Sequence, residues 1–351
     1  MKKAVSILTA ACLALSLAAC SSGSPSSAAA DPSSTSDTSE SSSAETAEDT
    51  GTDASAAAYT IGICQQQPHE ALDAATQGFK DALVEAFGED GVTFDEQNAQ
   101  GDSNTCATII NGFVSGGYDL IMANGTSALQ AAAAGTAGIP IPGTSRTEYR
   151  VALGVDGFAG TVGGNVSGTS DLAPLDQQAQ MLADFFPADQ YPTVGMLYCS
   201  AEPNSAYQVE QVTNYLTEMG YTVEDYSFSD SNDLATIATN ASTSCDVIYI
   251  PTDNTAASNT EIIQNICLPA GVPIIAGEQG ICSGCGVATL SISYYDLGYA
   301  TGEMAVQVLT GEADISTMPI EYAPNFTKMY NPSNCEALNI TVPDDYVAIE
   351  G

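Results

Sequence analysis

The residues best suited to chemistry in this sequence are polar side chains that directly follow short apolar segments. Six loops have this composition: residues 65–69, 124–127, 143–146, 200–205, 251–255 and 277–280. They supply hydroxyl groups and helix N-terminal amides, which suit a carboxylate, and acidic side chains, which suit an ammonium group. No single loop is specific, but together they indicate a binding site for a small charged molecule.

Common catalytic and cofactor-binding motifs are absent from the sequence. It contains no Gly-x-Ser-x-Gly, Gly-x-x-x-x-Gly-Lys, His-Glu-x-x-His or Gly-x-Gly-x-x-Gly. His69 is the only histidine, which leaves little material for histidine-based catalysis or a metal site. Cys282 and Cys285 lack a second pair at zinc-ribbon spacing, so we expect a disulfide or two thiols there. We therefore predict a protein that is not an enzyme, with no cofactor and no metal.

The chain is strongly acidic. Its 351 residues include 43 acidic and 6 basic side chains, which gives a formal net charge of −37 at pH 7. Such a charge repels phosphate backbones and anionic lipid surfaces, so nucleic-acid binding is excluded. The length supports about two compact units rather than one core.

The elements that must position the polar loops alternate between strands and helices. Apolar or β-branched runs predict strands at 59–64, 92–98, 120–123, 139–143, 193–198, 222–227, 247–250, 273–276 and 287–292. Helical periodicity predicts helices at 71–87, 104–114, 127–136, 175–186, 205–219, 256–268 and 296–310. Asp102 is a candidate N-cap, and Gly220 a candidate C-terminal stop.

This order restarts near residue 190, which predicts an α/β fold with two doubly wound parallel-sheet lobes. In such sheets, ligands bind outside the carboxyl ends of the strands. Two facing lobes would therefore form a cleft lined by the six polar loops.

The N-terminus has the pattern of an export signal. Lys2 and Lys3 precede an apolar run that ends in Leu-Ala-Ala-Cys, so we predict a signal peptide at 1–19 and lipidation of Cys20. Residues 20–58 are rich in Ser, Ala, Asp and Glu, which predicts a disordered tether. The predicted location is extracytoplasmic, anchored by lipid to the bacterial cell membrane.

Apart from Cys12 in the signal peptide and Cys20 at the anchor, the chain contains an even number of cysteines. These are Cys64, Cys106, Cys199, Cys245, Cys267, Cys282, Cys285 and Cys335. Disulfides are one interpretation, in a connectivity that the sequence does not define. Small buried thiols at the ends of apolar strands are the other.

Several of these segments resemble the periplasmic-binding-protein type I components of ABC importers, within the tryptophan/tyrosine substrate-binding group. The matching segments are Gln65 with 69–73, and 98–102, 165–171, 251–255, 275–278 and 294–305. The resemblance implies a hinged receptor without catalysis, which acts as a monomer and hands an aromatic amino acid or a similar small molecule to an ABC permease. Two departures lie beside the expected cleft: Pro-His-Glu at 68–70 where the family has Glu-His-Pro, and the cysteines at 282 and 285.

The resemblance also implies three crossings between the lobes. We place them near 168–171, 288–290 and 311–319. Lobe one would then comprise 59–169 and 290–312, and lobe two 170–289 and 313–345.

A buried zwitterion needs a partner for each of its charges. We assign the carboxylate to Thr126 and Ser127 in lobe one and to Asn204 and Ser205 in lobe two, because both pairs stand at predicted helix starts. Donors from both lobes would make closure depend on the ligand. Plain helix capping is the alternative for both serines.

The ammonium group is assigned to Asp253 and Glu278, with capping again the alternative for Asp253. For His69 the alternative is a plain polar loop residue, and for Tyr294 it is packing between the lobes. The full predicted contact set is Gln65, His69, Thr126, Ser127, Ser145, Asn204, Ser205, Asp253, Asn254, Glu278 and Tyr294.

One functional alternative stays open at this point. The same pair of lobes could report the presence of a sugar, a nucleoside or another amino acid to a receptor, without transport.

Overall fold

The structure of the protein is a computed structural model that describes residues 59–155 and 158–350. These residues belong to one compact unit. The predicted signal peptide at 1–19, Cys20 and the tether at 20–58 lie outside the described residues. Within the described ranges, no helix is both long enough and apolar enough to cross a membrane.

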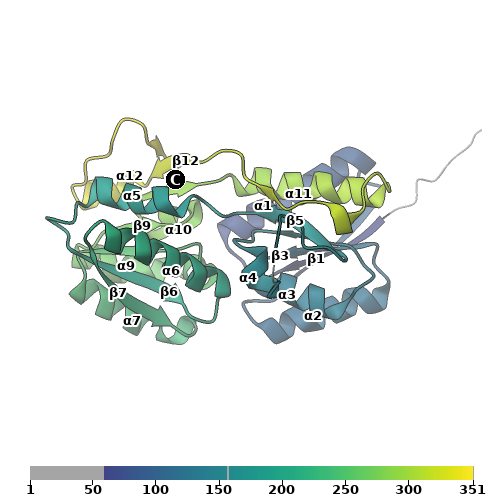
Figure 1. The fold of residues 1–351 in the computed structure, drawn as a ribbon, viewed down its shortest axis with the longest axis horizontal. Coiled ribbons are helices and arrows are strands. Elements are labelled where there is room, and N and C mark those ends of the chain that lie inside the picture. The colour runs from purple at the N-terminus through teal and green to yellow at the C-terminus, as the bar shows by residue number, and fades with distance from the viewer. Residues whose placement is uncertain (1–58, 156–157, 351) are drawn as a thin grey trace, which may run out of the picture. The chain divides into compact units, whose positions relative to one another are not determined.

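The first lobe is a six-stranded sheet with helices on both faces (Figure 1). Its strands are β1 (Tyr59–Gln65), β2 (Val92–Asn98), β3 (Leu120–Asn124), β4 (Ile141–Thr144), β5 (Val166–Ser170) and β11 (Glu321–Tyr322). Their order is β11-β5-β4-β3-β1-β2, and all neighbours are parallel. Its helices are α1 (Glu70–Phe87), α2 (Ser103–Gly116), α3 (Thr126–Gly135), α4 (Tyr149–Leu153) and α11 (Tyr294–Leu309).

Alternation along β1 explains why both faces of this sheet are covered. Ile61 packs with Phe79 of α1 in one core cluster. Cys64 packs with Phe113 of α2 in another. Successive strand residues point to opposite faces, so a strand buried on both faces needs an apolar layer on each side.

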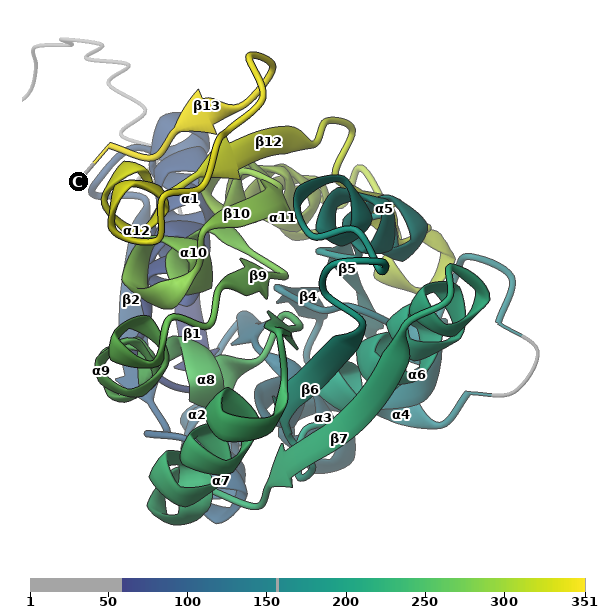
Figure 2. The same cartoon turned by 90° about the vertical axis from the view of Figure 1, so that its left-hand side faces the viewer.

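The second lobe is a seven-stranded sheet in the order β13-β12-β10-β9-β8-β6-β7. Its strands are β6 (Thr193–Cys199), β7 (Thr222–Phe228), β8 (Val247–Ile250), β9 (Ile274–Ala276), β10 (Ala288–Ser291), β12 (Thr327–Tyr330) and β13 (Val347–Ala348). Its helices are α5 (Leu175–Phe185), α6 (Pro203–Glu218), α7 (Ser231–Ser244), α8 (Asn254–Ala257), α9 (Thr260–Ala270), α10 (Gln279–Cys285) and α12 (Pro332–Ala337). Figure 2 shows α5 and α6 on one side of this sheet and α7, α9 and α10 on the other. Only β12 runs antiparallel to its neighbour β10 among the described pairings.

The expected α/β fold with two parallel-sheet lobes is confirmed. Each predicted strand is present, with ends that differ by at most two residues. Asp102 caps α2 through a hydrogen bond from the backbone N–H of Thr105, and Gly220 follows the end of α6 with a φ of 96°. The predicted helix at 256–268 is wrong as one element, because the chain breaks at Ser258 and Asn259 into α8 and α9.

Strand β5 was not predicted, because its sequence Val-Ser-Gly-Thr-Ser lacks an apolar run. All five of its residues are nevertheless buried. Their polar groups find partners in the protein: Ser167 Oγ donates to the carbonyl of Met318 at 3.0 Å, and the hydroxyls of Thr169 and Thr301 lie 2.8 Å apart. The expected crossing at 168–171 therefore overlaps a strand, and the chain leaves the first sheet after Ser170.

Strand pairing also corrects the third crossing, which we expected at 311–319. Glu321 and Tyr322 form β11, which pairs with β5 of the first sheet. Residues up to 322 therefore lie beside lobe one, and the chain reaches the second sheet only with β12. A two-residue edge strand is too short to show in the sequence pattern.

Helix α11 is held on α1 by glycines. A Cβ atom at Gly298 would lie 1.9 Å from the carbonyl oxygen of Ala75, and one at Gly78 would lie 2.1 Å from the carbonyl oxygen of Tyr295. Only glycine permits such an approach of two backbones. The chain that arrives from β10 is thus fixed to the first lobe directly at Tyr294.

Candidate functional site

Loops from both lobes meet around a small polar cavity at the carboxyl ends of the strands. It is lined by His69, Leu72, Ser145, Asp171, Asn204, Thr252, Asp253, Asn254, Ala257, Glu278 and Tyr294. The cavity volume is about 10 Å³, which is room for about one water molecule. A ligand the size of an amino acid therefore requires the lining side chains or the lobes to move apart.

Seven of the eleven predicted contact residues line this cavity: His69, Ser145, Asn204, Asp253, Asn254, Glu278 and Tyr294. The other four are Gln65, Thr126, Ser127 and Ser205. The side chain of Gln65 is used within the first lobe, where its Nε2 donates to Asp73 at 2.6 Å and its Oε1 accepts from Thr76 at 2.7 Å. The roles that we assigned to these residues stay predictions.

Hydrogen bonds that connect the lobes beside the cavity include the following three. The hydroxyl of Thr126 donates to Oδ1 of Asn204 at 2.8 Å. Nε2 of His69 lies 3.1 Å from Oδ1 of Asn254. The hydroxyl of Ser258 donates to the carbonyl of Pro68 at 3.0 Å. These bonds exist only when the lobes are together, so they stabilise the closed arrangement.

Glu202, which sequence reasoning did not select, organises the second-lobe side of the cavity. Its carboxylate accepts from the backbone N–H and Nδ2 of Asn254 at 3.1 and 2.6 Å. It also accepts from the backbone N–H and hydroxyl of Thr255 at 2.8 and 2.7 Å. This carboxylate holds the loop that carries Asn254 and is itself buried.

Asp253 and Glu278, the predicted ammonium partners, both cap helices. Asp253 accepts from the backbone N–H groups of Ala256 at 2.8 Å and Cys199 at 2.7 Å. Glu278 accepts from two backbone N–H groups of α10, each at 2.6 Å. Burial raises the pKa of both carboxyl groups to about 7, and the Glu202 carboxylate adds to the effect at Asp253.

Arg146 is the second residue that sequence reasoning passed over. Its side chain is 0% exposed, and none of its three guanidinium nitrogens has a hydrogen-bond partner. Burial lowers its pKa to about 10, so it remains charged at neutral pH. The sequence did hold a signal, because Arg146 is one of only six basic residues and lies in a strand-end loop next to Ser145.

Asp171 lies beside Arg146 and directly follows the carboxyl end of β5. Its backbone N–H donates to the carbonyl of Arg146 at 3.0 Å. Oδ2 of Asp171 accepts from the hydroxyl of Tyr294 at 3.1 Å, whereas Oδ1 is buried and has no partner. Burial raises the pKa of this carboxyl group, and the charge of Arg146 opposes that rise.

The loop that carries Arg146 has an uncommon backbone conformation. Ser145 has a φ of 53°, in the left-handed region that residues other than glycine seldom adopt. Its hydroxyl is buried without a partner. Such conformations cluster at ligand-binding sites because the surrounding fold must enforce them.

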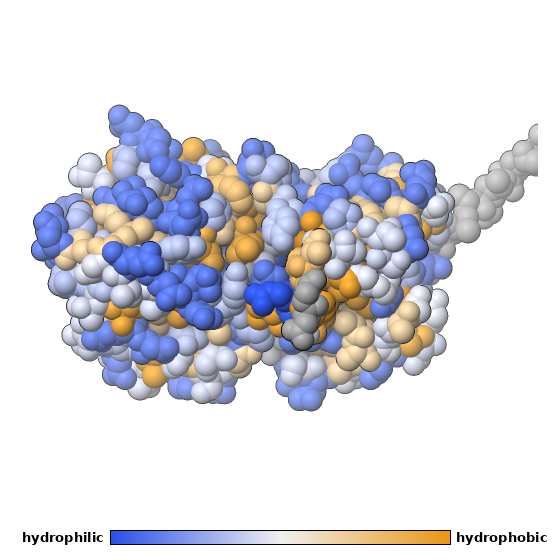
Figure 3. Space-filling view, in the orientation of Figure 1, coloured by the Kyte–Doolittle hydropathy of each residue, from blue (hydrophilic) through white to orange (hydrophobic). Residues whose placement is uncertain are grey.

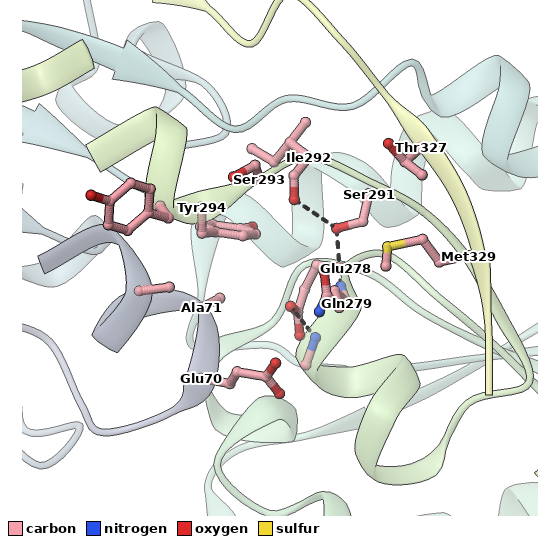
Figure 4. Close-up of a pocket in the computed structure, with 13 residues that line it drawn as sticks. Glu70, Ala71, Glu278, Gln279, Ser291, Ile292, Ser293, Tyr294, Thr327 and Met329 are labelled. Carbon is pink, nitrogen blue, oxygen red and sulfur yellow. Dashed lines mark hydrogen bonds between the residues drawn. The ribbon is translucent and has the colours of Figure 1, made fainter. Parts of the chain in front are cut away.

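A larger pocket of about 370 Å³ shares Glu278 and Tyr294 with the polar cavity. Figure 4 shows Ala71 of α1 and Tyr294 on one side of it, and Met329 of β12 on the other. This pocket offers apolar side chains close to the polar groups.

The outer surface differs from the cavity in its chemistry. Figure 3 shows hydrophilic side chains over much of the visible face, in keeping with 43 acidic residues in the sequence. All eight cysteines of the described chain are buried and carry free thiols. No group of three or more His, Cys, Asp or Glu residues suitable for a metal ion occurs in the part of the chain that the structure describes.

Comparison with known proteins agrees with this architecture. Residues 60–349 match the family model of ABC transporter substrate binding proteins. A tyrosine-binding protein from Clostridioides difficile (strain R20291) is 34% identical over 282 residues, which is 80% of this chain and 81% of that protein.

Two solved structures are similar over most of the chain. One is an ABC domain in complex with L-Trp from Streptococcus pneumonia, with 32% identity, a TM-score of 0.77 and coverage of 82% of this chain and 97% of that one. The other is the ligand-free, open structure of a substrate binding protein with adhesive properties from Clostridium difficile, with 35% identity, a TM-score of 0.63 and coverage of 83% and 100%. This chain thus belongs to the family of ABC transporter substrate binding proteins.

Proposed function

We propose that this protein captures an aromatic amino acid outside the cytoplasm and delivers it to an ABC permease. The observation that carries this proposal is the similarity to a tyrosine-binding protein and to a structure in complex with L-Trp. The cavity between the lobes supports it, because buried charged groups of both signs lie in or beside this small site. Those groups suit a zwitterion better than a neutral sugar.

Ligand contacts are proposed for the predicted residues that line the cavity. His69, Ser145 and Tyr294 would act from the first lobe, and Asn204, Asn254, Asp253 and Glu278 from the second. The apolar wall of the adjoining pocket would receive the aromatic side chain. The four predicted residues that do not line the cavity, Gln65, Thr126, Ser127 and Ser205, would support the closed arrangement around it.

Ligand capture would proceed by closure of the two lobes about the three crossings. The comparison of TM-scores supports this: the structure is more similar to the L-Trp complex than to the ligand-free open protein, although the identity is slightly lower for the complex. In this proposal the ligand leaves unchanged, because the protein acts as a monomeric receptor and performs no catalysis.

A screen for thermal stabilisation tests the ligand. A specific ligand at about 100 times its Kd adds about 2.7 kcal/mol of stability. We expect a shift with tyrosine, tryptophan or phenylalanine, and none with galactose or myo-inositol. A shift with a sugar and none with any aromatic amino acid would overturn the ligand assignment.

The membrane anchor is proposed from the lipobox pattern around Cys20. Replacing Cys20 with Ala removes the thiol to which lipid would be attached. The variant is expected in the soluble fraction or the medium, while the wild-type chain stays with the membrane. Equal membrane association of both would contradict the anchor.

A further inference from the structure

We propose that Arg146 binds the α-carboxylate and Asp171 the α-ammonium group of the ligand, so that the site recognises the backbone of a free α-amino acid. This inference rests on the proposed function and names the groups that would carry it. Neither residue was part of the predicted contact set.

The first argument is the state of Arg146. Its guanidinium group is fully buried, and all three nitrogens lack a hydrogen-bond partner. The ion pairs found among the described residues are Lys80–Glu96 and Lys328–Asp345, so Arg146 takes part in none. A buried charge without a partner is costly. A planar guanidinium matches a carboxylate through two parallel hydrogen bonds, which a ligand can supply.

The second argument is the state of Asp171. Its unpaired Oδ1 is buried at the cavity, and its other oxygen is held by the hydroxyl of Tyr294. The hydrogen bond from its backbone N–H to the carbonyl of Arg146 keeps the two residues adjacent. Two opposite charges are thus held near each other without pairing. An α-amino acid carries its own two charges on neighbouring atoms and complements both.

The third argument is that other unpaired polar atoms gather at the same place. The hydroxyl of Ser145 and Nδ1 of His69 are both buried without partners, and both residues line the cavity. Nδ2 of Asn254 donates to Glu202, so Oδ1 of Asn254 accepts the proton of His69 Nε2. That leaves Nδ1 of His69 as an acceptor, which suits an N–H of an ammonium group.

The fourth argument is the sign of the buried charge. Asp171, Glu202, Asp253 and Glu278 are all buried near the cavity, against the single cation Arg146. Burial lowers the pKa of His69, which favours its neutral form. Although Asp253 and Glu278 are only partly ionised near neutral pH, a ligand that brought only a carboxylate would still meet more acidic groups than cations. A neutral ligand would leave Arg146 without a partner, so the site favours a molecule that carries both charges.

The test uses the full exported chain and three probes in titration calorimetry. The probes are L-tyrosine, tyramine, which lacks the carboxylate, and 3-(4-hydroxyphenyl)propionate, which lacks the amine. We expect each analogue to bind wild type at least about 100-fold more weakly than tyrosine, because a buried charged partner is left unpaired. Tyramine binding within about threefold of tyrosine binding would overturn the role of Arg146.

Variants then assign each group. Arg146→Met should weaken tyrosine binding by about 100-fold or more, yet leave tyramine binding unchanged or stronger. The affinity of Arg146→Lys for tyrosine should lie between those of Arg146→Met and wild type, because Lys keeps the charge but not the planar guanidinium group. Asp171→Asn should weaken the binding of tyrosine but not the binding of 3-(4-hydroxyphenyl)propionate, which has no ammonium group. Arg150→Met is the matched control, since Arg150 is exposed on α4, and it should bind tyrosine like wild type.

The outcomes separate this inference from the proposed function. Suppose that wild type binds tyrosine or tryptophan, and that Arg146→Met binds the same amino acid equally well. If circular dichroism shows that the variant is folded, the inference about Arg146 fails and the proposed function stands. If wild type binds a non-aromatic amino acid, the same variants are tested with that amino acid and its decarboxylated amine. If it binds only a sugar, the proposed function fails and this inference falls with it.

Discussion

The two sides of the cavity differ in how their polar groups are satisfied. On the second-lobe side, Glu202 and Asp253 accept hydrogen bonds on both carboxylate oxygens, all from within the protein. On the first-lobe side, Ser145, Arg146 and Asp171 leave atoms buried without partners. A satisfied network rigidifies a fold, whereas unsatisfied buried groups cost free energy unless something else binds them. The comparison indicates that Glu202 and Asp253 on the second-lobe side are held mainly by the protein itself, whereas the first-lobe side keeps polar atoms open to the ligand.

The largest expected effect on stability comes from removing the Glu202 carboxylate, which accepts hydrogen bonds on the second-lobe side. Glu202→Ala leaves the two donors of Asn254 and the two donors of Thr255 without their acceptor. We expect a loss of about 3 to 5 kcal/mol in the free energy of unfolding, measured by urea denaturation without ligand. Glu210→Ala on the exposed face of α6 is the matched control, with a change within about 0.5 kcal/mol. A loss under 1 kcal/mol for Glu202→Ala would remove the distinction between the two sides.

Urea denaturation of Arg146→Met makes the same test on the first-lobe side, where we expect little or no loss of stability. Because the guanidinium has no hydrogen-bond partner, its removal strands no donor or acceptor, and the apolar Met fills similar space. The free energy of unfolding of the ligand-free protein should stay within about 1 kcal/mol of wild type or rise. A loss comparable to that of Glu202→Ala would show that Arg146 stabilises the fold as well.

Asp253 and Glu278, which cap helices, should make the stability of the folded protein depend on pH, and this effect should be of intermediate size. The folded pKa of Asp253 and of Glu278 is about 7, above their ordinary values of 3.8 and 4.5. The folded state therefore holds protons that the unfolded state has released, and stability is lost as pH rises through about 7. His69, whose pKa is lowered from 6.5, acts in the opposite direction below about pH 6.5.

The measurement is the thermal midpoint of the ligand-free protein between about pH 5 and 8. It should fall as pH rises toward about 7 and change little above that, and Asp253→Asn should reduce the slope. Asp90→Asn, at an exposed position, should leave the slope unchanged and so corrects for the general acidity of the chain. An equal slope in Asp253→Asn and wild type would contradict the raised pKa.

The contrast between the two sides also explains what the sequence could predict. Strand-end loops were found because parallel strands are buried apolar runs, and their polar successors fall at one edge of the sheet. Helix capping was the alternative that the sequence offered for Asp253, and its hydrogen bonds take that form. The pattern along the chain cannot show which polar atoms will lack a partner after folding.

Arg146 and β5 were missed for a related reason. A charged residue in a loop and a strand of Ser, Gly and Thr both have the composition of exposed segments. Both are buried here because the fold supplies surroundings that composition does not reveal, such as the partners from distant segments that satisfy β5. Buried polar segments are thus the part of this fold that local patterns predict least well.

The smallest expected effect concerns one of the hydrogen bonds that join the two sides, from Thr126 to Asn204. Thr126→Val keeps the shape of the side chain and removes one hydrogen bond that exists only in the closed arrangement. One such bond contributes about 1 kcal/mol, so closure becomes less favourable and the apparent affinity for the ligand should fall about fivefold. Thr108→Val, whose hydroxyl is exposed on α2, is the matched control and should not change affinity. Because the bond joins side chains of the two lobes and Thr126 itself does not line the cavity, the loss should be the same for tyrosine and for tyramine. A loss confined to tyrosine would instead mean that Thr126 touches the carboxylate, as the sequence first suggested.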